Sequence, residues 1–160
     1  MKKKMIEING KRYVTAGVFS DNCDMNTQKV VAACKDGRVL GACKDSSGRW
    51  IIPTETYKPL ETEYIRKVLV IVLYLKNWPE KEIDLSQYGN IVNLFIYLSK
   101  TGYIEEFDVN CERIPHEAIL TEKGMALATK GEKLDFDWLR DSSMIIQTVA
   151  ALLTFVKMVL

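Results

Sequence analysis

The first clear pattern in the chain is a short alternation of apolar and polar residues near the N-terminus. Residues 6–8 read Ile-Glu-Ile, and the pair Asn9 and Gly10 follows them. Alternation with a period of two is typical of a strand, and an Asn-Gly pair favours a tight hairpin turn because both residues tolerate positive φ. We therefore expect a strand that turns before Lys11 and packs at the edge of a first module.

A helical pattern begins at Asn26. Apolar residues recur at helical spacing from residue 30 to residue 34, and either Asn26 or Thr27 can supply the N-cap. Gly37 stands where a left-handed residue commonly ends a helix. The sequence thus predicts a short helix of about three turns. Its polar face carries Gln28, Lys29 and Lys35.

A hairpin is predicted directly after this helix. Residues 38–42 and 49–53 are β-forming segments, and the polar residues 44–48 between them include a glycine. Two such segments around a polar, glycine-containing turn are typical of a β-hairpin.

The N-terminal part of the chain is basic and the remainder is acidic. Residues 1–60 contain eleven Lys or Arg and six Asp or Glu, a net charge of +5, whereas residues 61–160 contain eleven and fifteen, a net charge of −4. A polyanionic partner is therefore expected to contact the N-terminal part.

Residues 48–53 read Gly-Arg-Trp-Ile-Ile-Pro. With the helix and hairpin that precede this ending, the run from residue 13 to residue 60 resembles the excisionase and MerR-like winged helix-turn-helix family, whose hairpin ends in roughly Gly-Arg-Trp-x-Ile-Pro. The resemblance implies a recognition helix in the DNA major groove, a wing along the backbone and a core position for Trp50. The DNA-binding residues expected on this basis are Asn26, Thr27, Gln28, Lys29, Lys35, Lys44 and Arg49.

The segment before the predicted helix departs from this family. Its members usually carry an acidic-Ala-Ala stretch and a Gly turn there, and residues 17–24 have a different composition. Asp21 and Asp24 would lie near DNA phosphates and repel them, unless they cap helix ends or bind a neighbouring lysine.

The second half of the chain predicts mainly helices. Residues 68–75 are continuously apolar and fit a buried strand or a buried helix, but the length of the segment and the possible cap at Thr62 favour a helix. A second helix is expected from Pro79. A third, closed by Gly102, is expected from the helical spacing of Ile91, Leu94, Phe95 and Leu98.

Two strands are predicted after these helices, in residues 103–109 and 118–120. Residues 98–104 and 120–124 resemble the end of the third helix and the start of the post-wing helix in MarR-like and PadR-like winged-helix proteins. The expected wing is acidic, so this module is interpreted as a scaffold or partner-binding surface rather than the main DNA reader. The acidic wing residues are Glu105, Glu106, Asp108 and Glu112.

The C-terminal residues 144–160 predict an apolar helix that Asp141 or the following serines can cap. Self-association into a homodimer or higher oligomer is expected to cover it. Membrane insertion is the alternative, although the helix would be shorter than the roughly 30 Å hydrocarbon core and Lys157 falls inside it. The oligomerisation residues expected are Ile145, Val149, Leu152, Leu153 and Val156.

The candidate chemistry of the chain does not indicate an enzyme. The four cysteines, Cys23, Cys34, Cys43 and Cys111, form no Cys-x-x-Cys pair and match no common zinc spacing with the single His116. They are interpreted as reduced thiols, because the N-terminal residues do not match the pattern of a signal peptide. We therefore expect no metal, no cofactor and no catalytic site, and a cytoplasmic location or one at the cytoplasmic face of a membrane.

Together these patterns predict a mainly α fold with small β-hairpin wings. Two tandem winged helix-turn-helix modules, residues 1–60 and 61–140, would precede an apolar C-terminal helix, residues 141–160. The expected function is sequence-specific binding of double-stranded DNA, as a transcriptional regulator or an accessory factor in mobile-element excision. The alternative is a non-enzymatic protein-interaction adaptor with degenerate winged helices, either free or tethered to a membrane by its C-terminal helix.

Overall fold

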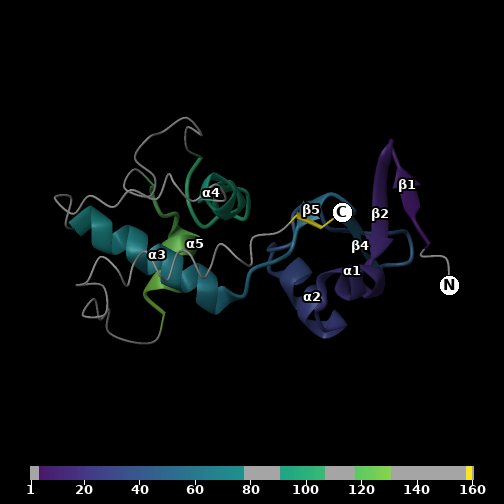
Figure 1. Ribbon diagram of the computed structural model, residues 1–160, viewed down its shortest axis with the longest axis horizontal. Helices are drawn as coiled ribbons and strands as arrows, with labels where there is room; N and C mark the ends of the chain where they lie inside the picture. The colour runs from purple at the N-terminus through teal and green to yellow at the C-terminus, as the bar shows by residue number, and fades with distance from the viewer. Residues whose placement is uncertain (1–3, 78–90, 107–117, 131–157, 160) are drawn as a thin grey trace. The chain divides into compact units, whose positions relative to one another are not determined.

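A computed structural model describes residues 4–77, 91–106, 118–130 and 158–159 of the chain (Figure 1). The chain divides into two compact units. The N-terminal unit contains the described residues before Leu60 together with the last strand, and the C-terminal unit contains those from Leu60 to Lys130.

The N-terminal unit combines a small sheet with two helices. Its elements are β1 (Ile6–Ile8), β2 (Lys11–Thr15), α1 (Ala16–Cys23), α2 (Thr27–Lys35), β3 (Cys43–Lys44), β4 (Trp50–Pro53), β5 (Thr56–Tyr57) and β6 (Met158–Val159). The described elements of the C-terminal unit are α3 (Thr62–Asn77), α4 (Ile91–Lys100) and α5 (Glu122–Ala128).

Four antiparallel strands form the sheet of the N-terminal unit, in the order β1-β2-β4-β3. The predicted edge strand is confirmed as β1, and its turn uses positive φ at Asn9 (49°) and Gly10 (76°). β2 and β4 are far apart in sequence but pair directly, with Val14 opposite Ile52. β5 pairs with β6 in a separate two-stranded sheet.

The two helices of this unit follow one another across a short turn. Thr15 caps α1 and accepts a hydrogen bond from the Val18 N–H. Asp24, in the left-handed conformation at φ 54°, ends α1, and the cap at Asn26 starts α2. The predicted helix is confirmed as α2. The predicted stop at Gly37 is also confirmed, because this residue has a φ of 75°.

The core of the N-terminal unit lies between the helix pair and the sheet. α1 packs against α2, β2 and β4. The resemblance implied a core position for Trp50, but Trp50 is only partly buried and packs against the core from its periphery. The buried residues of the core are Val14, Ala16, Phe19, Cys23, Val30, Ala33, Cys34, Val39 and Ile52.

The predicted strand in residues 38–42 is wrong. Those residues form turns, and pairing begins only at Cys43. Gly41 has a φ of 76°, and the Ala42 N–H donates to the Val39 carbonyl. Val39 is 3% exposed, because its side chain packs in the core together with residues of α1 and α2. The hairpin is therefore shorter than expected, with β3 limited to two residues.

The long apolar segment of the second half is confirmed as a helix, α3. Thr62 is its first residue rather than its cap, since the Ile65 N–H donates to the Glu61 carbonyl. Buried side chains lie on all sides of α3, from Ile65 to Leu75, as an all-round apolar helix requires. The helix that ends before Gly102 is confirmed as α4, and Gly102 has a φ of 85°. The helix predicted from Pro79 lies outside the described residues.

The predicted wing of the second half is reduced to one bridge within the described residues. Ile104 and Leu120 form an antiparallel bridge, and the Glu105 N–H donates to the Ile119 carbonyl at 2.8 Å. Residues 107–117 lie outside the described part. The helix start expected at residues 120–124 is confirmed, because Thr121 caps α5.

The predicted fold class, mainly α with two tandem winged helix-turn-helix modules and an apolar C-terminal helix, is contradicted. The N-terminal unit is organised by a four-stranded sheet, whose β2–β4 pairing joins segments that no local pattern connects. Met158 and Val159 form a strand rather than a helix end, since they pair with Tyr57 and Thr56 of β5. Within the described part of the chain, every helix is too short or too polar to cross a membrane.

Candidate nucleic-acid interface

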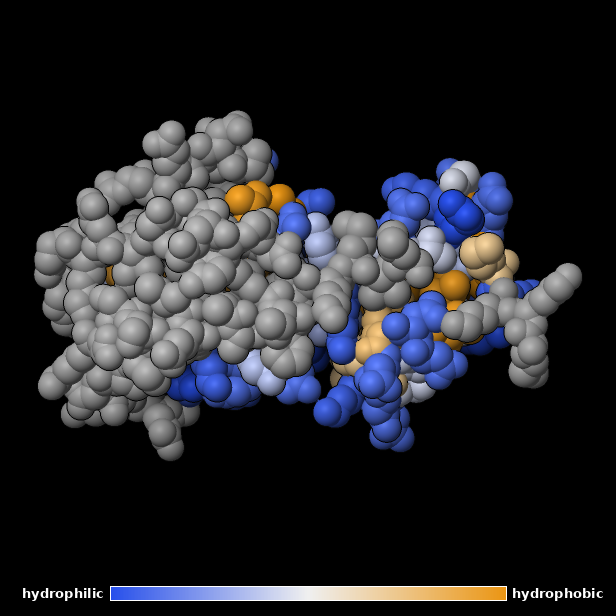
Figure 2. Space-filling view, viewed as in Figure 1, coloured by the Kyte–Doolittle hydropathy of each residue, from blue (hydrophilic) through white to orange (hydrophobic). Residues whose placement is uncertain are grey.

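The seven residues expected to bind DNA all lie in the N-terminal unit, and all are solvent-exposed. Five of them belong to α2 or its cap and two belong to the β3–β4 hairpin. The visible face of this unit carries mostly hydrophilic residues around a smaller apolar area (Figure 2).

The outer face of α2 is formed by residues three and four positions apart. Gln28, Ala32 and Lys35 share this face and are exposed, with Lys29 beside them. Val30 and Cys34 point into the core on the other side. Sequence reasoning missed Ala32, although its position between Gln28 and Lys35 was the available signal. Because the alanine side chain is only a methyl group, it does not project far from the helix, and a large ligand can approach the backbone of α2 closely at this position.

Asn26 has a structural role at the start of α2. Its side-chain Oδ1 accepts a hydrogen bond from the Gln28 N–H at 2.7 Å. This bond satisfies one of the backbone donors that a helix leaves unpaired at its first turn. The same contact holds the first turn of α2 in place and so positions Gln28.

Thr27 joins the two helices. Its hydroxyl lies 2.8 Å from the Ser20 hydroxyl of α1, and the Ser20 hydroxyl also donates to the Gly17 carbonyl at 2.7 Å. Because Ser20 uses its proton on that carbonyl, the Thr27 hydroxyl donates to Ser20. Ser20 is 2% exposed. Sequence reasoning did not identify Ser20, because nothing local distinguishes it from a surface serine.

The hairpin turn is organised by one carboxylate. The Asp45 side chain accepts hydrogen bonds from the backbone N–H groups of Ser47 (3.0 Å) and Arg49 (2.9 Å), and from the Ser47 hydroxyl (2.9 Å). The bond from the Arg49 backbone, and then that from the Ser47 hydroxyl, hold the pKa of the Asp45 carboxyl below its ordinary value. Gly48 completes the turn at a φ of 79°.

The two cations of the hairpin are also held by contacts. The Arg49 guanidinium forms an ion pair with Asp45 at 3.1 Å, while its side chain remains 65% exposed. The Lys44 ammonium lies 5.4 Å from the centre of the Trp50 ring, its partner across β3 and β4. Exposed cations with restricted side chains lose little conformational entropy when they bind an anion.

Two acidic residues flank the turn between the helices. Asp21 and Asp24 are exposed, and Asp24 is the C-cap of α1. The sequence left open whether these residues cap helix ends, and Asp24 does. Its cap is made by the backbone, however, because the Asp24 N–H donates to carbonyls of α1.

The described residues of the C-terminal unit carry as many exposed glutamates as exposed lysines, so its described surface is not basic. Lys100 is exposed at the end of α4, and Glu105 and Glu106 are exposed just beyond it. The Lys123 ammonium donates to the Thr101 carbonyl at 2.8 Å and lies 4.3 Å from the centre of the Tyr103 ring. Asp108 and Glu112 lie outside the described residues. So do the expected oligomerisation residues Ile145, Val149, Leu152, Leu153 and Val156.

The thiols of the N-terminal unit fall into two kinds. Cys23 and Cys34 are buried, and their burial raises the pKa of each thiol to about 11. Cys43 is exposed on β3. Within the described residues, no three His, Cys, Asp or Glu side chains lie close enough together to hold a metal ion. Cys111 and His116 are not among those residues.

Comparison of the chain with protein-family models, curated proteins and solved structures found no match.

Proposed function

We propose that the N-terminal unit binds double-stranded DNA in a sequence-specific manner, as expected for a transcriptional regulator or an accessory factor in mobile-element excision. The observation that carries the proposal is the exposed polar face of α2, which α1 holds in place through the Ser20–Thr27 hydrogen bond. We also propose that residues 13–60 are related to the excisionase and MerR-like proteins that they resemble.

The dimensions of α2 suit the major groove. An α-helix with its side chains is about 10–12 Å across, and the major groove is about 12 Å wide, so the groove admits a helix such as α2. Gln28, near the N-terminal end of α2, can form paired hydrogen bonds with an adenine edge. Ala32 offers an apolar contact for a thymine methyl group.

The hairpin supplies phosphate contacts in this proposal. Lys44 and Arg49 are exposed, and the contacts with Trp50 and Asp45 orient their side chains. Phosphate contacts fix the position of a protein on the duplex but carry no sequence information. The hairpin therefore contributes affinity, and α2 contributes specificity.

The test begins with selection of bound sequences from a random duplex library, which is expected to enrich one motif. Binding of that motif should weaken steeply with salt, and Lys44→Ala with Arg49→Ala should flatten the slope. Lys67→Ala with Lys76→Ala removes the same charge from exposed positions of the C-terminal unit and should leave the slope unchanged. If the folded protein has no affinity for any selected duplex at low salt, the proposal fails.

Gln28 tests the specificity of the same interface. Gln28→Ala should cost about 1–3 kcal/mol at one base-pair position and little against random DNA. An equal loss on every sequence would assign Gln28 to a phosphate contact or to the structure of α2. Sedimentation of the full chain on the selected duplex tests the expected homodimer, which would present two α2 helices to a paired site.

A protein-interaction adaptor is the second candidate. The exposed carboxylates of Asp21 and Asp24, beside the start of α2, favour it, because they would repel phosphates there. If these residues oppose DNA binding, Asp21→Asn with Asp24→Asn should raise DNA affinity. If α2 contacts another protein instead, the library selection enriches no motif.

A further inference from the structure

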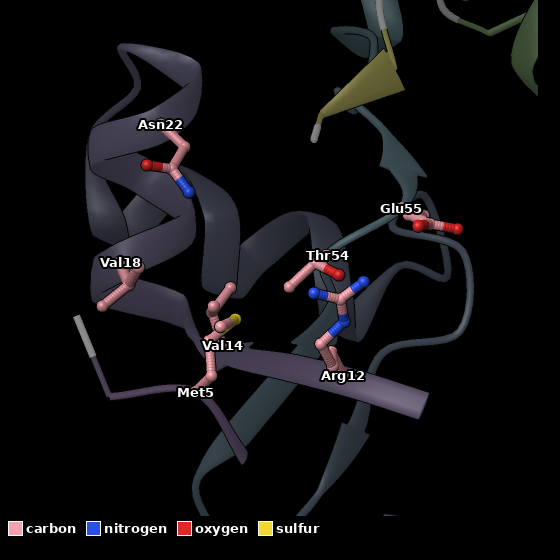
Figure 3. A pocket seen from close by; sticks show the side chains of 7 residues that line it. All are labelled: Met5, Arg12, Val14, Val18, Asn22, Thr54 and Glu55. Carbon is pink, nitrogen blue, oxygen red and sulfur yellow. The ribbon is translucent and has the colours of Figure 1, made fainter. Parts of the chain in front are cut away.

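A groove on the N-terminal unit lies beside α1 (Figure 3). Its volume is about 460 Å³, within the range of pockets that bind small molecules. None of the seven expected DNA-binding residues lines it.

Separate segments of the chain build the walls of the groove. Val18 and Asn22 lie one turn apart on the same side of α1, and Arg12 and Val14 lie two residues apart on the same face of β2. Thr54 lies on the same wall as Arg12, because its backbone N–H donates to the Arg12 carbonyl at 3.0 Å. This hydrogen bond extends the β2–β4 pairing and fixes the position of the wall.

One part of the groove is apolar. Val14 and Val18 line it from the sheet and the helix, and Met5 projects beside them (Figure 3). Met5 is 57% exposed, so a large apolar side chain faces water at the mouth of the groove. An aliphatic chain bound there would remove this surface from water, which is favourable in proportion to the area covered.

The other part of the groove is polar and contains an unneutralised cation. Within the described part of the chain, Arg38, Arg49 and Arg66 each lie within 4 Å of a carboxylate, whereas the Arg12 guanidinium makes no ion pair or hydrogen bond. Figure 3 shows the Arg12 side chain extending beside Thr54, across the groove from Asn22. Glu55 lies at the margin, on the side away from Val18.

We propose that this groove binds a small aliphatic carboxylate. The aliphatic chain would lie against Met5, Val14 and Val18, and the carboxylate would pair with the Arg12 guanidinium, whose planar donors match a carboxylate in a bidentate geometry. The proposal does not depend on DNA binding, because no residue of the groove belongs to the DNA interface.

The experiment is a titration of the isotope-labelled full chain with sodium octanoate, followed by the amide resonances of the residues that line the groove. Saturable shifts confined to this site are expected. Arg12→Gln should weaken octanoate binding by roughly tenfold, the usual order for a lost charge-assisted hydrogen bond. Lys11→Gln removes the same charge from the neighbouring exposed residue on the other face of β2, and should bind octanoate like the wild type.

A second pair of variants tests the apolar wall with exposed residues. Met5→Glu places a negative charge at the mouth of the groove and should abolish octanoate binding. Ile8→Glu places the same charge at an exposed position of β1 that does not line the groove, and should have no effect.

Two further probes separate charge recognition from adsorption to an apolar surface. Octanol and octylammonium, which share the chain and lack the carboxylate, should bind at least roughly tenfold more weakly than octanoate. Equal binding of octanol and octanoate, or equal weakening by Arg12→Gln and Lys11→Gln, would overturn the proposal.

Discussion

The carboxylate of Asp45 holds the hairpin turn together, and its ionisation controls that role. Because hydrogen bonding lowers its folded-state pKa below the unfolded value of about 3.8, its contribution to stability is complete above that value and is lost as the pH falls through the folded pKa. Asp45→Asn should therefore lower the free energy of unfolding at neutral pH and remove this part of the acid dependence. Urea unfolding at neutral and acidic pH measures both effects.

The control for Asp45 is Asp21→Asn, which removes one carboxylate from an exposed position of the same unit outside the hairpin. It should leave the acid dependence close to that of the wild type. A carboxyl titration of Asp45 by NMR with a midpoint at or above the ordinary value would contradict the assignment of these hydrogen bonds.

Gly124 of α5 is required by close packing. A Cβ atom at this position would lie 1.9 Å from the Tyr103 carbonyl oxygen, a distance that forces the helix away from the chain beside it. Gly124→Ala should lower the free energy of unfolding by roughly 1–3 kcal/mol, the usual cost of overpacking. Chemical denaturation measures the change.

Gly17 of α1 provides the opposite case for comparison. A Cβ atom there meets nothing within 4 Å, and the backbone is helical. Gly17→Ala should therefore stabilise the protein by roughly 0.5–1 kcal/mol, because alanine loses less backbone entropy in a helix. Similar effects from the two substitutions would show that helix propensity, rather than the contact with Tyr103, determines the result.

At the scale of elements, the start of α2 contains one residue with a structural role, Asn26, and one with a proposed recognition role, Gln28. Asn26→Ala removes the N-cap and should cost about 1 kcal/mol of stability. Because the first turn of α2 then loosens, DNA affinity should fall by a similar factor on every sequence, in contrast to Gln28→Ala. Thermal unfolding and binding to selected and random duplexes measure the two effects.

Asn26→Ser is the matched variant, because serine also caps helices. It should retain both stability and affinity. A loss of preference at one base-pair position in Asn26→Ser would instead place Asn26 in contact with a base.

The elements that the sequence predicted correctly have strong local signals. β1 ends in an Asn-Gly turn, and α2 begins with a capping residue and ends near Gly37. α1 has no such signal, because Gly17 and the polar residues 20–22 are weak helix formers. Contacts distant in sequence support this helix, since Phe19 is fully buried in the core and Ser20 bonds to Thr27.

The incorrect predictions come from tertiary context. Residues 38–42 contain Val39, a residue type that favours strands, but positive φ at Gly37 and Gly41 turns the chain at both ends of the segment. Burial of Val39 then fixes it in the core. Likewise, Met158 and Val159 continue a helical pattern, yet pairing with β5 places them in a strand.

The candidate site was only partly predictable, because the role of a side chain also depends on tertiary contacts. The polar face of the predicted helix and the resemblance to winged helix-turn-helix proteins identified seven residues that are all exposed. These signals did not distinguish the cap at Asn26 or the helix-to-helix bond of Thr27 from recognition roles. The groove beside α1 was not predictable. Its walls combine Met5, Arg12, Val18 and Thr54, which come together only when β2 pairs with β4.

At the scale of the whole molecule, each of the two units has an apolar core formed by its own described residues. One surrounds Phe19 in the N-terminal unit, and the other surrounds α3 in the C-terminal unit, where Leu69, Phe95 and Leu98 are almost fully buried. Within the second core the Tyr97 hydroxyl accepts a hydrogen bond from the Leu60 N–H at 3.2 Å. Units with their own cores behave as separate folding units unless a large apolar interface couples them.

A core in each unit predicts two unfolding transitions in the full chain. Gly17→Ala changes only the N-terminal unit and should raise the midpoint of one transition, whereas Gly124→Ala changes only the C-terminal unit and should lower the midpoint of the other. Combining the two substitutions should give the sum of the single effects, because each substitution changes contacts within its own unit. Differential scanning calorimetry measures the midpoints. The reactivity of the Cys23 and Cys34 thiols assigns one transition to the N-terminal unit, because these buried thiols become accessible only when that unit unfolds. A single transition that both substitutions shift would mean that the two units unfold as one cooperative body.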